Sequence, residues 1–307
     1  LMALMWAASG TAVVLALANF ARGRNPNRSV AWGVLGLLPA LFWMWVGVLG
    51  LARWSVRYVP NDLAMNLGRR AGASLMELEA ARTYPHRLVS RRLVMSYRDL
   101  AAPEADVSRA EHYLADLERL VERPLSSRIH WIRGTALGLG QLSTYGLSLG
   151  SETSDPVLAH LDRHELAHAV LAQLVPPDAE LPTILNEGWA QACAYGWLTP
   201  ADPDDRARLD AEARLRAQQL RYAPDFAHFR TLFGPAWYHQ DSGPVYDHGP
   251  ILVRYLVRRY GIHAFLKLCA IIRPDRVDES FRAVCGVDLA AIERDLYAEA
   301  AAATPQP

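Results

Sequence analysis

Cysteine and lysine are both scarce in this sequence. The three cysteines, Cys193, Cys269 and Cys285, are odd in number and show no C-x-x-C spacing. This pattern excludes a disulfide framework and a thiolate zinc cluster, and it fits small buried hydrophobic side chains. Lys267 is the only lysine, so the abundance of arginine reflects a compositional bias and does not indicate an arginine-rich recognition surface.

Acidic residues are missing from the beginning of the chain. Residues 1–61 contain five arginines and no Asp or Glu, whereas all 307 residues together hold 32 basic and 32 acidic side chains. The remainder therefore carries 27 basic and 32 acidic side chains, a net charge near −5, which argues against nucleic-acid binding. With 51% hydrophobic and 21% charged residues, the chain can fold around a sizeable core.

Two long uncharged runs, residues 1–20 and 30–52, dominate this acid-free region. Each is long enough to cross a hydrocarbon layer of about 30 Å as a helix that rises about 1.5 Å per residue. Trp32 and Trp54 stand near the ends of the second run, where indoles favour the headgroup layer. We therefore predict an integral membrane protein with a transmembrane hairpin over residues 1–57. A buried helical hairpin in a soluble protein, or a signal peptide in place of the first span, is the alternative.

The charges around the two runs predict which side of the membrane holds the rest of the chain. The connector at residues 21–29 contains three arginines and an Asn-Pro-Asn turn. By the positive-inside rule this connector is cytoplasmic, so the domain that follows the second span is extracytoplasmic. The opposite orientation is favoured by arginines at the other end of that span, namely Arg53, Arg57, Arg69 and Arg70.

The rest of the sequence predicts an α+β organisation with no internal repeat. Helical patterns near 61–82, 86–101 and 108–122 predict a helical connector over residues 58–124. Two short strands are expected at 128–134 and 142–149, separated by glycine-rich turns. Beyond them the patterns are helical, near 157–174, 183–197, 201–221, 245–260, 262–272 and 288–302. The main domain is expected over 125–302, followed by a frayed tail at 303–307.

One of these predicted helices contains the sequence His164-Glu165-Leu166-Ala167-His168. A spacing of four places both imidazoles on one helix face, so their nitrogens can bind a single Zn²⁺ at about 2.0–2.1 Å. Glu165 is rotated by about 100° from His164, which directs its carboxylate toward a water on the metal. A surface helix can match this pentapeptide by accident, so the pentapeptide alone does not decide the matter.

A second motif, ILNEGWA at residues 184–190, begins the next predicted helix. Eighteen residues separate His168 from Glu187, enough for the first helix to end at Pro176 and the second to return alongside it. Two His and one Glu leave the fourth tetrahedral position to water, which is typical of a catalytic zinc site, whereas a structural site has four protein ligands. The alternative for Glu187 is an acidic residue favoured by the dipole at a helix N-terminus.

These two motifs resemble those of the gluzincins, the zincin metallopeptidases with a glutamate ligand, and in particular the aminopeptidase-N group. That group combines HExxH with a glutamate after a gap of the same length, in a WLNEGFA-like segment. A third element, Tyr246-Asp247-His248-Gly249, resembles the group's Y-E-K-G sequence. The resemblance covers about residues 125–300.

The resemblance implies a zincin-like catalytic domain with a small antiparallel sheet and a mainly helical lower part. It implies one Zn²⁺ bound by His164, His168 and Glu187, with Glu165 as the general base and Tyr246 as the hydrogen-bond donor to the oxyanion. The alternative for Tyr246 is a core aromatic on an amphipathic helix. Gly249 would let that helix approach the site closely.

An edge strand expected at residues 144–149 precedes the first histidine. In gluzincins such a strand binds an extended substrate by main-chain hydrogen bonds, which recognises a peptide backbone. The aminopeptidases also have a G-A-M-E-N segment whose glutamate holds the substrate's amino group. No acidic residue occurs between Arg133 and Gly150, which favours endopeptidase cleavage over a strict aminopeptidase.

The sequence thus predicts a membrane-anchored zinc metallopeptidase that cleaves a polypeptide substrate with a zinc-bound water activated by Glu165. Three alternatives stay open: an aminopeptidase on the same scaffold, a hydrolase of a non-peptide substrate, and a non-catalytic membrane module that binds a partner and keeps zinc for stability. Site-2-type intramembrane proteolysis is disfavoured, because Asp162, Arg163 and the turn at 176–178 bound the HELAH helix too tightly for a membrane span.

Overall fold

The computed structural model describes residues 84–133, 147–150, 160–176, 179–199, 203–224, 226–234 and 243–302. All of them belong to the second of two compact units of the chain, residues 66–307. Within these described ranges, no helix combines the length and the apolar character that a bilayer crossing requires. The two predicted spans, the predicted helix at 61–82 and the tail at 303–307 lie outside the described residues.

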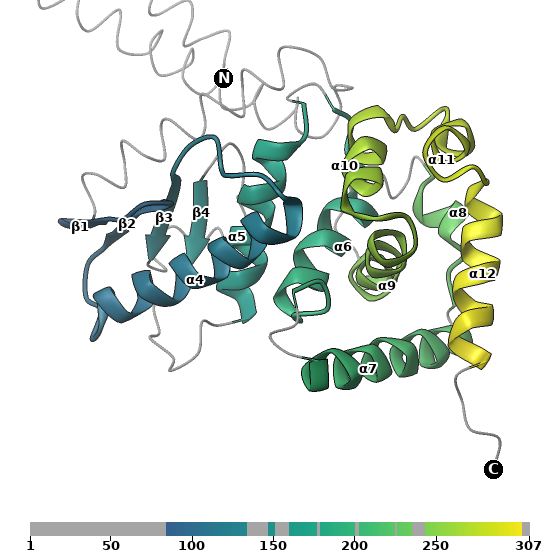
Figure 1. Cartoon of the computed structure of the whole chain (residues 1–307), viewed down its shortest axis with the longest axis horizontal. Coiled ribbons are helices and arrows are strands. Elements are labelled where there is room, and N and C mark those ends of the chain that lie inside the picture. Colours follow the sequence, from purple (N-terminus) through teal and green to yellow (C-terminus); the bar gives the residue numbers. More distant parts are fainter. Residues whose placement is uncertain are drawn as a thin grey trace, which may run out of the picture. The chain divides into compact units, whose positions relative to one another are not determined.

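Four strands form one small sheet in the order β1-β2-β3-β4 (Figure 1). The strands are β1 His86–Val89, β2 Leu93–Tyr97, β3 Ile129–Arg133 and β4 Leu147–Gly150. β1 and β2 are antiparallel, whereas the pairs β2–β3 and β3–β4 are parallel. The expected antiparallel sheet is therefore wrong, and the sheet is mixed. A helix connects β2 to β3, and a crossover of this kind makes the two strands that it joins parallel.

The expected helix at 86–101 is also wrong, because these residues form β1 and β2. In β2 the consecutive side chains of Leu93, Val94 and Met95 are all buried, so the strand has no polar face that would give an alternating pattern. β2 lies before residue 124 and β3 lies after it, and the two strands pair in one sheet. The boundary between a helical connector and the main domain was expected at residue 124, so this sheet contains strands from both predicted regions.

Helix α4, Pro103–Val121, connects the two central strands and packs against β1 and β2. Pro103 suits the first turn of a helix because its missing N–H is not needed there. Ala110, Leu114, Leu117 and Val121 recur every three or four residues and are at most 1% exposed. This spacing forms the apolar face that packs on the sheet.

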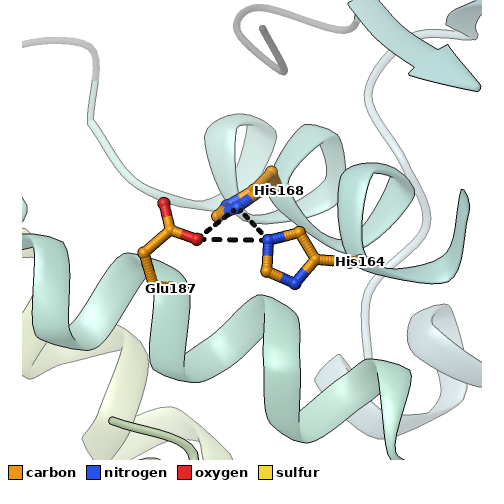
Figure 2. Close-up of side chains that lie close together, drawn as sticks. All are labelled: His164, His168 and Glu187. Atoms are coloured by element: carbon orange, nitrogen blue, oxygen red, sulfur yellow. Dashed lines mark hydrogen bonds and ion pairs between the residues drawn. The ribbon is translucent and has the colours of Figure 1, made fainter. Parts of the chain in front are cut away.

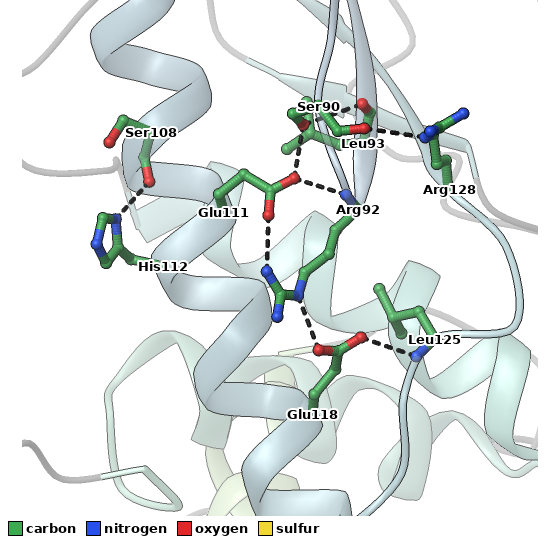
Figure 3. A network of polar contacts seen from close by, with 9 residues as sticks. All are labelled: Ser90, Arg92, Leu93, Ser108, Glu111, His112, Glu118, Leu125 and Arg128. Carbon is green, nitrogen blue, oxygen red and sulfur yellow. Dashed lines mark hydrogen bonds and ion pairs between the residues drawn. The ribbon is translucent and has the colours of Figure 1, made fainter.

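Arg92, which directly precedes β2, connects the sheet to α4 (Figure 3). Its guanidinium donates to Oε2 of Glu111 and to Oε2 of Glu118, each at 2.8 Å, and its backbone N–H donates to Oε1 of Glu111 at 2.6 Å. The hydroxyl of Ser90 also donates to Glu111 at 2.6 Å, and the backbone N–H of Leu125 donates to Glu118 at 2.9 Å. Each carboxylate oxygen therefore accepts at least one hydrogen bond.

The second half of the described chain is helical. Its helices are α5 His160–Leu174, α6 Thr183–Ala194, α7 Pro203–Arg221, α8 Phe229–Leu232, α9 Gly243–Tyr260, α10 Ile262–Ile271, α11 Val277–Cys285 and α12 Leu289–Ala302. Each helix expected in this region has a counterpart, while α8 and α11 are additional. Figure 1 shows α5 beside β4 and α6 between α5 and α9, an arrangement that the residue contacts support. The coarse expectation of a mostly helical α+β domain is confirmed.

The core of the helical half surrounds α6. Trp189 of α6 is fully buried, and its ring stacks on Phe265 of α10 with centroids 5.7 Å apart. Its indole N–H donates to the carbonyl of Ala167 in α5 at 2.8 Å. One side chain therefore fixes α6 against two neighbours. Cys193 and Cys269 are fully buried and free, as expected of small core side chains, whereas the free Cys285 is only half-buried.

Candidate metal centre

Helix α5 carries the two histidines in a strongly buried segment. Every residue from 164 to 171 is buried, and so is Asp162. Asp162 accepts a hydrogen bond from the guanidinium of Arg133 at 3.2 Å, which ties the start of α5 to β3. The hydroxyl of Tyr113 in α4 donates to the carbonyl of Arg163 at 2.9 Å. These contacts fix the position and rotation of the helix that presents the histidines.

The two imidazoles and the Glu187 carboxylate point toward one another from α5 and α6 (Figure 2). Nε2 of His164 lies 3.0 Å from Nε2 of His168, and the two nitrogens lie 3.1 and 3.2 Å from Oε2 of Glu187. The three residues are each 7–8% exposed. Among the described residues, they are the group of His, Cys, Asp or Glu side chains that can hold a metal ion. Their expected convergence is confirmed.

The spacing of these three atoms fits a metal ion. Donors at about 2.0–2.1 Å from a tetrahedral zinc ion lie about 3.3–3.4 Å from one another. The observed separations of 3.0–3.2 Å therefore need to grow by only about 0.1–0.4 Å to reach this geometry. Imidazole nitrogens and a carboxylate oxygen are ligands that suit zinc and several other transition metals. The site can hold a metal ion whose identity the geometry leaves open.

Charges within the cluster shift the pKa values of two of its members. Burial alone raises the pKa of Glu187, but the charge of His168 and the hydrogen bonds from both histidines lower this pKa to about 2. Burial lowers the pKa of His168, but the charge of Glu187 and its hydrogen bond outweigh burial, so the pKa of His168 is raised. Glu187 is therefore ionised near neutral pH, which is the form that binds a metal.

Two amide side chains of α6 contact the histidines on their other ring nitrogens. Oδ1 of Asn186 lies 3.1 Å from Nδ1 of His168, and Oε1 of Gln191 lies 2.8 Å from Nδ1 of His164. Partners of this kind orient the imidazoles of metal sites. Neither residue was predicted from the sequence as a partner of the histidines. Asn186 directly precedes Glu187, and Gln191 follows it by one helical turn. These positions were the sequence signal that could have indicated contacts with the histidines.

Two glycines bring α6 and α9 into backbone contact beside the cluster. A Cβ atom added to Gly188 would lie 2.5 Å from the carbonyl carbon of Gly249, and one added to Gly249 would lie 2.7 Å from the carbonyl oxygen of Ile184. Both distances are far below van der Waals contact, so only glycine fits at this crossing. The expected role of Gly249 in close approach is confirmed, and Gly188 matches it from α6.

Glu165 and Tyr246, the two predicted catalytic residues, lie close to the three side chains of the candidate metal centre. Glu165 is 2% exposed, and its charge raises the pKa of the neighbouring His168 imidazole. Tyr246 of α9 is half-buried, and its ring centroid is 6.3 Å from that of His164 with the ring planes 31° apart. The structure thus gathers all five predicted site residues, while their roles as base and oxyanion donor stay predictions.

His248, two residues after Tyr246, lies away from the cluster. It is 3% exposed, and its Nδ1 lies 3.0 Å from the hydroxyl of Tyr297 in α12. Since residues two apart on a helix face different directions, Tyr246 can face the cluster while His248 packs against α12.

Comparisons with protein-family models and with curated proteins find no match for this chain. The interpretation of the site therefore depends on its geometry and on the chemistry of its side chains.

Proposed function

We propose that the protein is a membrane-anchored zinc metallopeptidase that cleaves peptide bonds within polypeptides. The observation that carries the proposal is the convergence of His164, His168 and Glu187 to within 3.0–3.2 Å of one another. Two neutral imidazoles and one carboxylate form the ligand set of catalytic zinc sites that keep an open coordination position. Zinc bound there would polarise the substrate carbonyl and lower the pKa of water to about 7.

In this proposal, Glu165 accepts a proton in the first step and donates it in the second. Its carboxylate takes a proton from the attacking water, whose oxygen forms a bond to the carbonyl carbon. The same carboxyl group then gives the proton to the amine nitrogen as the C–N bond breaks, so the products are a carboxylic acid and an amine. The position next to His164 and the burial of Glu165 support this role, because a buried base keeps its proton from exchanging freely with solvent.

Tyr246 supplies a hydrogen-bond donor to the carbonyl oxygen as negative charge develops there. A neutral phenol is a suitable donor, and removing one such donor costs about 2.7–4 kcal/mol in comparable sites. The ring of Tyr246 lies 6.3 Å from that of His164, and this nearness to the cluster supports the role.

The sheet supports a polypeptide as substrate. β4 has β3 on one side and is an edge strand among the described residues. It also packs beside α5, so a chain that pairs with its free edge would run past the histidine helix. Main-chain pairing of this kind does not depend on a free amino terminus. The absence of acidic residues between Arg133 and Gly150 fits endopeptidase cleavage, and the uncharged runs at 1–20 and 30–52 support the membrane anchor.

The full chain, purified in detergent, tests the proposal. We expect one equivalent of zinc per chain and cleavage of members of a peptide library at internal bonds. The E165Q variant should retain zinc and lose hydrolysis, whereas E279Q, which changes an exposed glutamate of α11, should behave like the wild type. E165Q with wild-type turnover would contradict the role of Glu165.

The same assay separates the alternatives. Cleavage restricted to the first residue of each peptide would identify an aminopeptidase. Zinc content without hydrolysis of peptides or other substrates would support a non-catalytic membrane module, and a chain that binds no zinc would contradict all of these functions.

A further inference from the structure

We propose that Gln191 is a positioning residue that fixes the tautomer of His164 for metal binding through an uncharged amide. The inference rests on the metal site of the proposed function and adds a residue outside its ligand set. Nε2 of His164 can bind a metal only when the ring proton is on Nδ1. That proton requires a hydrogen-bond acceptor in a site where His164 is 7% exposed.

The amide of Gln191 is oriented to be this acceptor. Its Oε1 lies 2.8 Å from Nδ1 of His164, and its Nε2 donates to the hydroxyl of Tyr195 at 3.0 Å. The contact with Tyr195 holds the amide nitrogen away from the imidazole and keeps the oxygen toward it. An amide oxygen accepts but does not donate, so the proton stays on Nδ1 and the lone pair stays on Nε2.

A second imidazole supports the same orientation. Nε2 of His160, one turn before His164, lies 3.3 Å from Oε1 of Gln191, and the His160 ring packs on the Tyr195 ring with centroids 5.0 Å apart. The amide is therefore held at both ends, by Tyr195 directly after α6 and by two histidines on α5. Gln191 also lies one turn after Glu187 on the same helix face. One helix thus sets both the carboxylate ligand and the orientation of the opposite imidazole.

Cobalt(II) binding to the full chain in detergent tests the inference, with visible absorption as the readout. Q191L removes the acceptor, and we expect the dissociation constant for Co²⁺ to rise about 10–100-fold. Q191E keeps an acceptor oxygen at the same place and should restore affinity to within a few-fold of the wild type. Q219L makes the same change at an exposed position of α7 and should leave the constant unchanged. Y195F frees one end of the amide and should weaken binding less than Q191L.

The outcomes separate this inference from the proposed function. A wild-type protein that binds no Co²⁺ would contradict the metal site itself. A wild type that binds Co²⁺ with the same affinity as both Q191L and Y195F would overturn only the role of Gln191. Equal weakening in Q191L and Q191E would also overturn it, because an effect of packing alone is not rescued by the acceptor. Thermal unfolding of the metal-free variants monitors folding, and Q191M replaces Q191L if the leucine variant does not fold.

Discussion

Two polar clusters of this domain are opposite in chemical character. At the Arg92 cluster, Arg92, Ser90 and Leu125 supply donors to the carboxylates of Glu111 and Glu118 (Figure 3). At the candidate metal centre, two imidazole nitrogens and a carboxylate oxygen face a common point (Figure 2). The first cluster matches positive and negative groups within itself. The second gathers electron-pair donors, and this difference marks it as a site for a cation.

The backbone supports the two clusters differently. At the Arg92 cluster, the long side chains of Glu111 and Glu118 extend from α4 and accept hydrogen bonds from the Arg92 guanidinium and from two backbone N–H groups. At the metal centre the short side chains depend on the positions of α5, α6 and α9, and α6 meets α9 at Gly188 and Gly249. A small backbone shift would therefore separate the three side chains of the candidate metal centre.

The largest change in stability is expected when a carboxylate of the candidate metal centre is exchanged for an amide. The same exchange in the Arg92 cluster provides the comparison. At a zinc concentration of about 1,000 times the dissociation constant, binding stabilises a folded protein by about 4 kcal/mol. We expect E187Q to lose most of this metal-dependent stabilisation. E118Q should keep it, although its metal-free form unfolds more easily than the wild type. Chemical unfolding with and without zinc measures both effects. Equal stabilisation of E187Q and the wild type by zinc would remove the distinction between the clusters.

A smaller effect is expected from Tyr246, which the proposal places at the substrate and not at the metal. Y246F should lower kcat/KM about 10²–10³-fold, corresponding to about 2.7–4 kcal/mol, because the donor to the developing oxyanion is lost. Zinc content should not change. Y222F alters a tyrosine that is 81% exposed and provides the matched control. Wild-type kcat/KM in Y246F would leave this tyrosine as a core aromatic on α9.

The sequence predicted the convergence of His164, His168 and Glu187, because it depends on spacing along two neighbouring helices. A four-residue spacing fixes the relative position of His164 and His168 within α5, and the length of the connection to α6 allows Glu187 to return beside them. Helices such as α9 were predictable because their apolar positions recur with a helical period.

The sheet and the hydrogen-bond partners of the histidines were less predictable. Residues 93–95 form a short apolar run that does not distinguish a strand from a helix, and only pairing with β3 decides. The parallel direction of that pairing results from the α4 crossover, which no local pattern encodes. Gln191 and Asn186 contact the histidines because of the rotation of α6 against α5, which depends on packing between the helices and not on either helix alone.

The helix crossing allows a test of how strictly the metal centre depends on backbone position. G188A should destabilise the protein by about 1–3 kcal/mol, because the new methyl group would overlap the Gly249 backbone. Metal affinity should fall as well, since Glu187 directly precedes the site of strain. G243A adds a methyl group where no atom lies within 4 Å, so its stability should equal or exceed that of the wild type. Urea unfolding and Co²⁺ titration measure the two effects. Unchanged stability in G188A would show that the crossing can relax without cost.

The smallest change in the free energy of unfolding, about 1 kcal/mol, is expected at the Arg92 cluster. This change should depend on pH. Burial raises the pKa of Glu111, but hydrogen bonds from Ser90 and Arg92 and the charge of Arg92 lower it overall. A carboxyl group with a lowered pKa in the folded state contributes stability above its unfolded pKa of about 4.3, and this contribution disappears as the pH falls through the folded value. In the presence of a chelator, E111Q should therefore be less stable than the wild type at pH 7, and the difference should shrink below about pH 4. E122Q, which alters a glutamate that is 68% exposed, should show little difference at either pH. The difference in the free energy of unfolding between E111Q and the wild type could instead stay constant from pH 7 to pH 3. This result would mean that the ionised form of Glu111 is not the one that Arg92 stabilises.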